Sequence, residues 1–284
     1  MSDFALQLSH VTKHYKDFTL NRLSFTVPRG SIVGLIGENG AGKSTTINAI
    51  LGLTRFDEGS IRIFDKAANE ADRNDLGVVF DGNSLPDTLT PRQLGRVFAG
   101  LYSRWDEQVY RDLLKRFSLP SDKKIKALSK GMKMKYAIAV ALSHDARLLI
   151  LDEATSGLDP IVRDEILDLF LDFIQDEDHA ILVSSHITTD LEKVADYLVF
   201  LHEGNIVFAQ AKDQLMESYG LLKCGPAQLE TIDPEDILRC RRNEYECQVL
   251  VTDRARIARK YPQLIVDPVS IDEIMLMYIK GEAK

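Results

Sequence analysis

The stretch Ser31-Ile-Val-Gly-Leu-Ile-Gly37-Glu-Asn-Gly-Ala-Gly42-Lys43-Ser44 determines the fold. Its first six residues predict a buried strand, and the pattern of residues 43–51 predicts a helix. Between them, Gly37 to Ser44 match GxxxxGK[ST], which is typical of a phosphate-binding loop when it joins a strand to a helix. Glycines let such a loop curl with its backbone N–H groups pointing inward, and the helix N-terminus adds partial positive charge. The stretch therefore predicts a nucleoside triphosphate site rather than an ordinary glycine-rich turn.

The side chains of this loop are assigned separate roles. We expect the Lys43 ammonium to reach the β- and γ-phosphate oxygens, which also makes it a catalytic candidate. We expect the Ser44 hydroxyl to ligate Mg²⁺. The residues predicted to contact the nucleotide are Gly37, Glu38, Asn39, Gly40, Ala41, Gly42, Lys43, Ser44 and Thr45.

A second apolar stretch, Leu148-Leu-Ile-Leu-Asp152-Glu153, predicts a buried strand that ends in two carboxylates. Ligands of open α/β sheets bind at the carboxyl ends of the strands, so both side chains are expected beside the phosphates. Asp152 is assigned to the Mg²⁺ shell, through a water molecule. Glu153 is assigned as the general base that activates the attacking water, a role that contributes about 10²–10⁴-fold in rate. The alternative, a solvated acidic turn, is disfavoured because the same chain carries a phosphate loop.

Apolar segments typical of strands alternate with helical patterns along the chain, which predicts an α/β fold with a mostly parallel sheet. A further strand is expected at residues 181–183 and a helix at residues 159–174, for which Asp159 is a suitable N-cap. Residues 89–144 are rich in helix formers and predict a helical insertion between two strands of the sheet.

The pattern changes after about residue 210, which divides a main domain at residues 1–210 from a small α+β annex at residues 211–284. Within the annex, residues 246–251 alternate weakly like a strand, and Ser270-Ile-Asp-Glu273 resembles a capping box that opens a terminal helix. The three cysteines of the chain also lie there, without a CxxC pair, which disfavours a structural zinc site or a disulfide framework.

Composition excludes several classes of protein. The chain has 284 residues, of which 45% are hydrophobic, so it can build a sizeable core. No apolar run approaches the roughly 18 residues that cross a bilayer, and the N-terminus lacks the layout of a signal peptide. The 35 Lys and Arg residues against 43 Asp and Glu residues give a net charge of −8, which disfavours broad binding to nucleic acid. A membrane-spanning or secreted protein is therefore not expected.

Together with further motifs, these residues resemble the nucleotide-binding subunits of ABC transporters over roughly residues 4–210. The motifs occur in the family's order: an aromatic residue at Tyr15, the phosphate loop, a Q-loop near Asp81, a signature at Leu128-Ser-Lys-Gly-Met132, the acidic strand, a D-loop at Ser156-Gly-Leu-Asp159 and a switch histidine at His186. The resemblance implies a P-loop ATPase fold of the ABC type, with an antiparallel β subdomain beside the mostly parallel sheet.

The same resemblance implies roles for the remaining motif residues. Tyr15 would stack on adenine, Asp81 would join the Mg²⁺ shell, and His186 would hold the γ-phosphate and the attacking water in line. Two subunits would pair head to tail, so that Ser129 and Gly131 touch the γ-phosphate bound by the partner. The implied enzyme is an ATPase with ATP and Mg²⁺ as cofactors.

Two motifs depart from the family's pattern. Asp81 stands where the family has a glutamine, and a carboxylate can ligate Mg²⁺ but cannot donate a hydrogen bond as an amide does. In the signature, Lys130 replaces a glycine and Met132 replaces a glutamine, whereas Ser129 and Gly131 are kept. Because both catalytic side chains at the strand ends are present, we expect an active ATPase, at full or reduced rate. An alternative is that one of two composite sites in a heterodimer is weak.

The signature variant and the tail resemble bacterial exporter ATPases that are encoded apart from a six-helix permease. This implies a peripheral subunit on the cytoplasmic face of the membrane, which dimerises with itself or a second ATPase subunit and powers a permease that exports a drug, peptide, antibiotic or lipid. One alternative is a soluble ABC-type ATPase acting on ribosomes or DNA, which the single phosphate loop and the lack of a sustained heptad run disfavour. No nucleic-acid partner is expected. Another alternative is a regulatory subunit that binds ATP without hydrolysing it.

Overall fold

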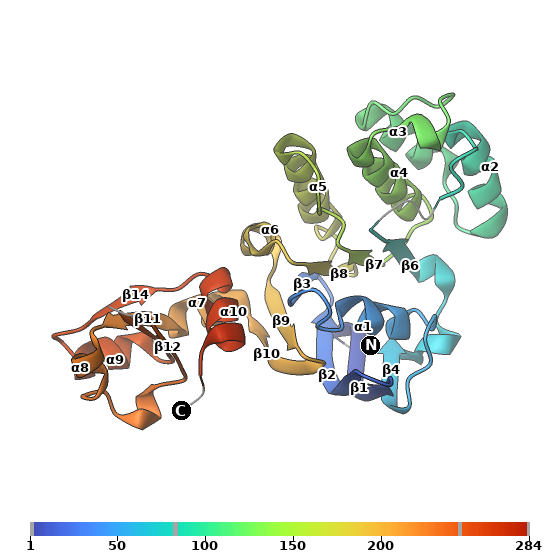
Figure 1. The fold of residues 1–284 in the computed structure, drawn as a ribbon. Helices are drawn as coiled ribbons and strands as arrows, with labels where there is room; N and C mark the ends of the chain where they lie inside the picture. Colours follow the sequence, from blue (N-terminus) through green and yellow to red (C-terminus); the bar gives the residue numbers. More distant parts are fainter. Residues whose placement is uncertain (1–2, 82–84, 244–245, 283–284) are drawn as a thin grey trace. The chain divides into compact units, whose positions relative to one another are not determined.

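The computed structural model describes residues 3–81, 85–243 and 246–282, which form two compact units, Met1–Ala209 and Gln210–Lys284 (Figure 1). This division falls one residue before the domain boundary drawn from the sequence. Each unit has its own apolar core.

A six-stranded sheet forms the centre of the first unit. Its strands are β3 (Ser31–Ile36), β6 (Leu76–Val79), β7 (Leu148–Asp152), β8 (Ala180–Ser185), β9 (Tyr197–His202) and β10 (Asn205–Ala211). They lie in the order β10-β9-β3-β8-β7-β6, and the pairs from β9 to β6 are parallel. Strands β3, β7 and β8 are buried along their whole length, as parallel strands covered on both faces should be. The mostly parallel sheet and the three strands predicted within it are confirmed.

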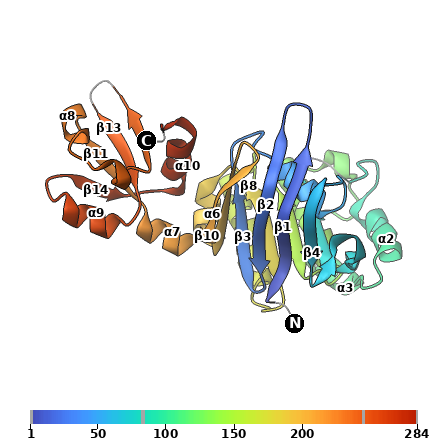
Figure 2. The same ribbon diagram turned by 90° about the horizontal axis from the view of Figure 1, so that it is seen from below.

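A four-stranded antiparallel sheet makes up the β subdomain, which Figure 2 shows with β1, β2 and β4 side by side. Its strands are β1 (Phe4–His14), β2 (Thr19–Pro28), β4 (Glu58–Ile63) and β5 (Lys66–Ala67). One apolar cluster contains residues of this sheet, of the parallel sheet and of helix α1 (Lys43–Ile50). The phosphate loop is therefore anchored between two sheets, because it joins β3 directly to α1.

The helical insertion consists of α2 (Pro91–Leu101), α3 (Glu107–Arg116) and α4 (Lys130–Leu142), which are grouped together in Figure 1. Thr90 and Gln93 form a capping box at the start of α2. The three helices are linked by the Tyr110 hydroxyl, which lies 2.7 Å from Pro91 O and 3.0 Å from the Tyr136 hydroxyl. Burial raises the pKa of Tyr110 to about 12. The insertion is thus a packed three-helix group between β6 and β7.

Two helices flank the strands that carry the site. Helix α5 (Pro160–Phe173) is capped by Asp159, whose side chain accepts a hydrogen bond from Val162 N at 3.1 Å. The predicted helix and its cap are confirmed. Helix α6 (Thr188–Val194) follows β8. Short 3₁₀ turns lie at Ala68–Glu70, Arg73–Asp75, Ile125–Ala127 and Pro234–Asp236.

The second unit is an α+β fold around a four-stranded antiparallel sheet in the order β12-β13-β11-β14. The capping box of Ser270 and Glu273 at the start of its last helix is present, as predicted. Cys224, Cys240 and Cys247 are buried in its core and form no disulfide, and burial raises the pKa of Cys224 to about 11. Its elements are α7 (Lys212–Ser218), β11 (Gly220–Cys224), α8 (Pro226–Leu229), β12 (Arg239–Arg242), β13 (Cys247–Val251), α9 (Arg254–Lys260), β14 (Ile265–Pro268) and α10 (Ile271–Lys280).

None of the helices in the described part of the chain is both long and apolar enough to cross a membrane.

Candidate functional site

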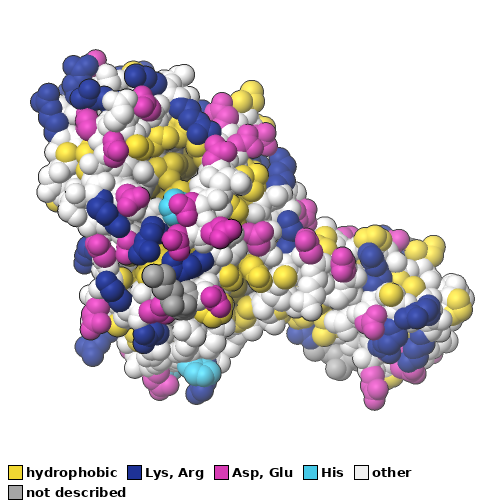
Figure 3. All heavy atoms as spheres, turned by 180° about the vertical axis from the view of Figure 1, so that it is seen from behind, with side chains coloured by type: hydrophobic (Ala, Val, Ile, Leu, Met, Phe, Trp, Pro, Cys, Tyr) yellow, Lys and Arg dark blue, Asp and Glu magenta, His cyan; other side chains and the backbone are white. Residues whose placement is uncertain are grey.

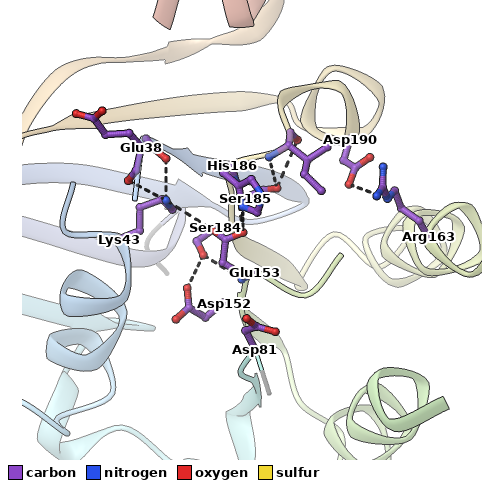
Figure 4. Close-up of polar contacts among 12 residues, drawn as sticks. Glu38, Lys43, Asp81, Asp152, Glu153, Arg163, Ser184, Ser185, His186 and Asp190 are labelled. Carbon is purple, nitrogen blue, oxygen red and sulfur yellow. Dashed lines mark hydrogen bonds and ion pairs between the residues drawn. The ribbon is translucent and has the colours of Figure 1, made fainter. Parts of the chain in front are cut away.

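Four neighbouring parallel strands deliver the candidate site residues to one edge of the central sheet. Gly37 follows β3, His186 follows β8, Glu153 follows β7, and Asp81 lies two residues after β6. Figure 4 shows the side chains of Lys43, Glu153, His186 and Asp81 gathered at this edge. A cavity of about 360 Å³ opens there, and its lining consists of Phe18, Asn39, Gly40, Gly42, Lys43, Ser44, Thr45, Asp81, Glu153, Ser156 and His186.

The phosphate loop has a backbone that favours glycine at two positions. Gly40 has φ +87° and Gly42 has φ +112°, both in the region that favours glycine. A Cβ on Gly42 would also lie 2.6 Å from Leu20 Cδ2 and 2.9 Å from Phe18 Cζ. The first N–H groups of α1 have no partners within the helix, so they are available to phosphate oxygens at the mouth of the cavity.

Lys43 is buried in the loop, and its ammonium has both backbone and side-chain partners. Its Nζ donates hydrogen bonds to Gly37 O at 2.7 Å and to Glu38 O at 3.2 Å. The same nitrogen lies 3.4 Å from Glu153 Oε1. The predicted phosphate-binding lysine and the predicted general base are therefore in direct contact at the cavity.

Glu153 is held in an unusual conformation. Its φ is +54°, a strained value for a residue with a side chain. Its backbone N–H lies 3.1 Å from both Ser184 O and Ser184 Oγ, which fixes the backbone at the end of β7. Its Oε2 lies 2.5 Å from His186 Nδ1. This places the side chain between Lys43 and His186, so the structure brings together all three predicted catalytic residues.

Asp152 is buried one residue earlier, and its partner was not predicted from the sequence. The register of β7 and β8 sets Asp152 opposite Ser184, whose hydroxyl donates to Asp152 Oδ1 at 2.5 Å. Ser184 thus contacts the carboxylate of Asp152 and the backbone of Glu153 at the end of β7. In the sequence, the position of Ser184 two residues before His186 was the one feature that could have indicated this role.

The donors predicted for Mg²⁺ are oxygen atoms, as that ion requires. Ser44 and Asp81 line the cavity, and Asp152 lies beside it at the end of β7. Among the described residues, no group of three or more His, Cys, Asp and Glu side chains is arranged to hold a metal ion. Mg²⁺ is commonly bound by one or two carboxylates together with substrate phosphates.

The predicted adenine contact, Tyr15, is 45% exposed, and it is Phe18 that lines the cavity. The two rings are neighbours, with centroids 6.4 Å apart. Phe18 was not predicted from the sequence, although it is an aromatic residue only three positions after Tyr15. Phe18 thus presents an aromatic side chain to the cavity, and Tyr15 is its neighbour.

The other end of the loop faces a second cavity of about 540 Å³, lined in part by Glu38, Asn39 and Ala41. Glu38 Oε1 lies 3.1 Å from His202 Nδ1. Glu38 and Ala41 therefore contribute to the shape of the loop from its outer side, whereas Asn39 lines both cavities.

The predicted signature residues lie apart from the cavity of their own chain. Ser129 caps α4 by accepting a hydrogen bond from Met132 N at 3.2 Å, and its side chain is exposed. Gly131 lies against α5, since a Cβ there would be 3.2 Å from Val162 Cγ1. The structure of one chain thus joins the phosphate loop, the acidic strand and His186, but not Ser129 and Gly131.

Comparison with known proteins agrees with this geometry. The family described as ABC transporter matches residues 20–156. The chain is 34% identical to the ABC transporter ATP-binding protein NatA of Bacillus subtilis (strain 168), over 69% of this chain and 83% of the relative. It is 33% identical to the Nod factor export ATP-binding protein I of Rhizobium sp. (strain N33), over 84% of this chain and 80% of the relative.

Solved structures show the same fold. One described as an ATP binding subunit of an ABC transporter superposes with a TM-score of 0.68 at 30% identity, covering 74% of this chain and 90% of that chain. A dimeric ATP-binding cassette in a post-hydrolysis state, bound to ADP and Pi, superposes with a TM-score of 0.65 at 24% identity. This match covers 72% of this chain and 98% of that chain. At that identity the second likeness is one of fold.

Proposed function

The chain belongs to the ATP-binding subunits of ABC transporters, and from this membership we propose that it pairs with a second ATPase subunit around ATP and powers export through a membrane permease. The protein is an ATPase, since the family couples ATP hydrolysis to transport.

The observation that carries the proposal is the continuous contact from Lys43 through Glu153 to His186. A carboxylate beside an imidazole, within reach of a phosphate-binding lysine, can accept a proton from a water molecule that attacks the γ-phosphate. His186 orients that carboxylate, and Lys43 stabilises charge on the phosphates. Mg²⁺, held by Ser44, Asp81 and Asp152, would neutralise the phosphate charge.

The nucleotide base has two aromatic side chains available beside the loop. Tyr15 is exposed and Phe18 lines the cavity. Stacking a base on an aromatic face contributes about 1–3 kcal/mol. We therefore place adenine between the phosphate loop and this aromatic pair.

A second subunit follows from the position of the signature. Ser129 and Gly131 lie outside the cavity of their own chain, so they contact nucleotide only if another chain's cavity is brought to them. A solved cassette of the same fold is dimeric, which is consistent with such a pair. In that arrangement each site combines the phosphate loop of one subunit with Ser129 and Gly131 of the other, in a homo- or heterodimer.

Export through a permease on the cytoplasmic face of the membrane is supported by the relatives. The Nod factor protein is named for export, and it is 33% identical to this chain over 84% of this chain and 80% of the relative. The permease would hold the subunit at the membrane. The transported molecule would be a drug, peptide, antibiotic or lipid, in keeping with the exporter subgroup.

The alternative of a soluble ATPase acting on ribosomes or DNA is not favoured. Both curated relatives reported above are ABC transport proteins. On the face shown in Figure 3, Lys and Arg side chains are interspersed with Asp and Glu, and the net charge of the chain is −8. Such a surface disfavours binding to a phosphate backbone.

The test is to express the tagged protein at its native level, solubilise the membranes in mild detergent and identify what co-purifies. We expect a polytopic permease, and ATPase activity that increases when the permease is present. Recovery of ribosomes or DNA-repair proteins, with none of the protein in the membrane fraction, would overturn the transport function and leave the ATPase intact. ATP binding without turnover would favour the regulatory alternative.

A further inference from the structure

Lys130, the first residue of α4, forms an ion pair with a carboxylate of the nucleotide cavity. Its Nζ lies 3.5 Å from Asp81 Oδ1. Asp81 lines the same cavity as Lys43 and Ser44. The pair therefore connects the signature of the chain with the chain's own nucleotide site, although the neighbouring Ser129 does not reach that site.

The ammonium of Lys130 also lies against the turn that follows the catalytic strand. A Cβ on Gly157, which has φ +66°, would lie 3.0 Å from Lys130 Nζ. Gly157 belongs to the turn between β7 and α5. Three segments thus meet at one positive charge: the residues after β6, the start of α4 and the turn after Glu153.

This ion pair is weak enough to be exchanged. The side chains of Asp81 and Lys130 are 49% and 50% exposed. Exposed pairs of this kind change an equilibrium by at most about fivefold. A divalent cation is a stronger partner for a carboxylate than a solvated ammonium, because its charge is doubled and it prefers oxygen ligands. Asp81 can therefore leave Lys130 when a metal–nucleotide complex enters the cavity.

We propose that Asp81 is shared between Lys130 and the metal–nucleotide complex, so that nucleotide binding in a chain's own cavity releases Lys130 to contact the phosphates held by the partner subunit. Lys130 is then a positioning residue whose availability depends on the occupancy of its own site. The proposal rests on the proposed function, because the second contact requires the head-to-tail pair. Its first half, the competition for Asp81, takes place within one chain and is tested separately.

The competition predicts a metal-dependent effect on nucleotide affinity. Lys130→Ala removes the competitor for Asp81, so the Kd for ADP with Mg²⁺ should fall about two- to fivefold. The Kd for ADP in EDTA should not change. Calorimetry on the full chain, below the concentration at which it dimerises, measures both values.

Two variants control for charge and for folding. Lys133→Ala removes a lysine from the same helix and should leave both affinities unchanged. Lys130→Arg keeps the positive charge and should behave as the wild type. If Lys130→Ala changes affinity equally with and without Mg²⁺, or changes neither, Asp81 is not shared and the proposal is wrong.

The release of Lys130 is tested by dimerisation in the Glu153→Gln variant with ATP and Mg²⁺. Adding Lys130→Ala should weaken the dimer about tenfold, the size expected for one charge-assisted hydrogen bond. Light scattering measures each dissociation constant.

The outcomes separate this inference from the function on which it rests. If the Glu153→Gln variant dimerises with ATP and Lys130→Ala leaves that dimer unchanged, the partner contact of Lys130 is wrong and the transport ATPase stands. If the Glu153→Gln variant stays monomeric at every ATP concentration, the head-to-tail pair is itself wrong, and the partner contact of Lys130 is overturned with it.

Discussion

Glu153 and Asp236 are both acidic side chains with basic neighbours, and they lie in different units. Glu153 is 15% exposed, contacts Lys43 and His186, faces a cavity and has a strained φ of +54°. The Asp236 side chain is 2% exposed in the second unit, at the end of the 3₁₀ turn Pro234–Asp236. Its donors are Arg256 Nη2 at 2.6 Å, Lys260 Nζ at 2.6 Å and the Tyr261 hydroxyl at 2.7 Å.

The two carboxylates differ in whether their partners leave room for a ligand. The hydrogen bond from Lys260, followed by those from Tyr261 and Arg256, lowers the pKa of Asp236 to about 2 despite its burial. Three donors satisfy this carboxylate, and no ligand is needed to complete its surroundings. Glu153 has one lysine and one imidazole, both of which also face the cavity. Basic neighbours alone therefore do not distinguish the candidate catalytic carboxylate, whereas a strained backbone together with a shared cavity points to Glu153.

The largest effect is expected for Glu153→Gln. The amide cannot accept a proton from water, so ATP turnover should fall by about 10²–10⁴-fold. Thermal stability should change little, because the contacts that fix the backbone come from Ser184. A turnover assay and a melting curve check both statements, with the exposed Glu177→Gln as the matched control. Turnover within a few-fold of wild type would show that Glu153 is not the general base and that its role, like that of Asp236, is structural.

Asp236→Asn should lower the stability of the second unit and leave ATP turnover almost unchanged, which is the opposite of the result expected for Glu153→Gln. Loss of the charge weakens three hydrogen bonds at once, and amide hydrogens of β11 and β13 should exchange about tenfold faster or more. ATP turnover by the first unit should remain within about twofold of wild type, because Asp236 belongs to the other unit's core. Hydrogen exchange followed by mass spectrometry reports the two units separately. Unchanged exchange in the second unit would show that the three donors do not stabilise it.

Lowering the pH should remove the contribution of Asp236 to the stability of the wild-type chain. The pKa of Asp236 is about 2 in the folded state, against about 3.9 for an unperturbed Asp. A lowered folded-state pKa contributes stability that is present above about pH 4 and is lost as the pH falls toward 2. The difference in exchange between wild type and Asp236→Asn should therefore shrink from pH 5 to pH 3. A difference that stays constant over that range would contradict the assignment.

Most of the site could be predicted from the sequence because its side chains directly follow strands that the local sequence pattern indicates. A GxxxxGK[ST] loop after an apolar run places Lys43, and an apolar strand ending in two carboxylates places Glu153, without knowledge of the sheet order. Ser184 could not be placed in this way, because its bond to Asp152 depends on the pairing of β7 with β8. The donors to Asp236 lie at least 20 residues away in the sequence, on α9 and just after it, and only packing brings them together.

Ser184 gives the smallest expected effect and the sharpest test, because it combines both kinds of role. It is fully buried, donates to Asp152 Oδ1 and accepts from the backbone N–H of Glu153. Ser184→Ala should lower stability by about 1 kcal/mol through the lost hydrogen bonds. It should also lower ATP turnover several-fold, since Glu153 would be held less firmly. Ser185→Ala, at the next position of β8, is the matched control and should affect turnover less. If Ser184→Ala changes stability alone, the strained backbone of Glu153 is maintained without the serine, and the support for the catalytic carboxylate lies in the backbone pairing of β7 and β8.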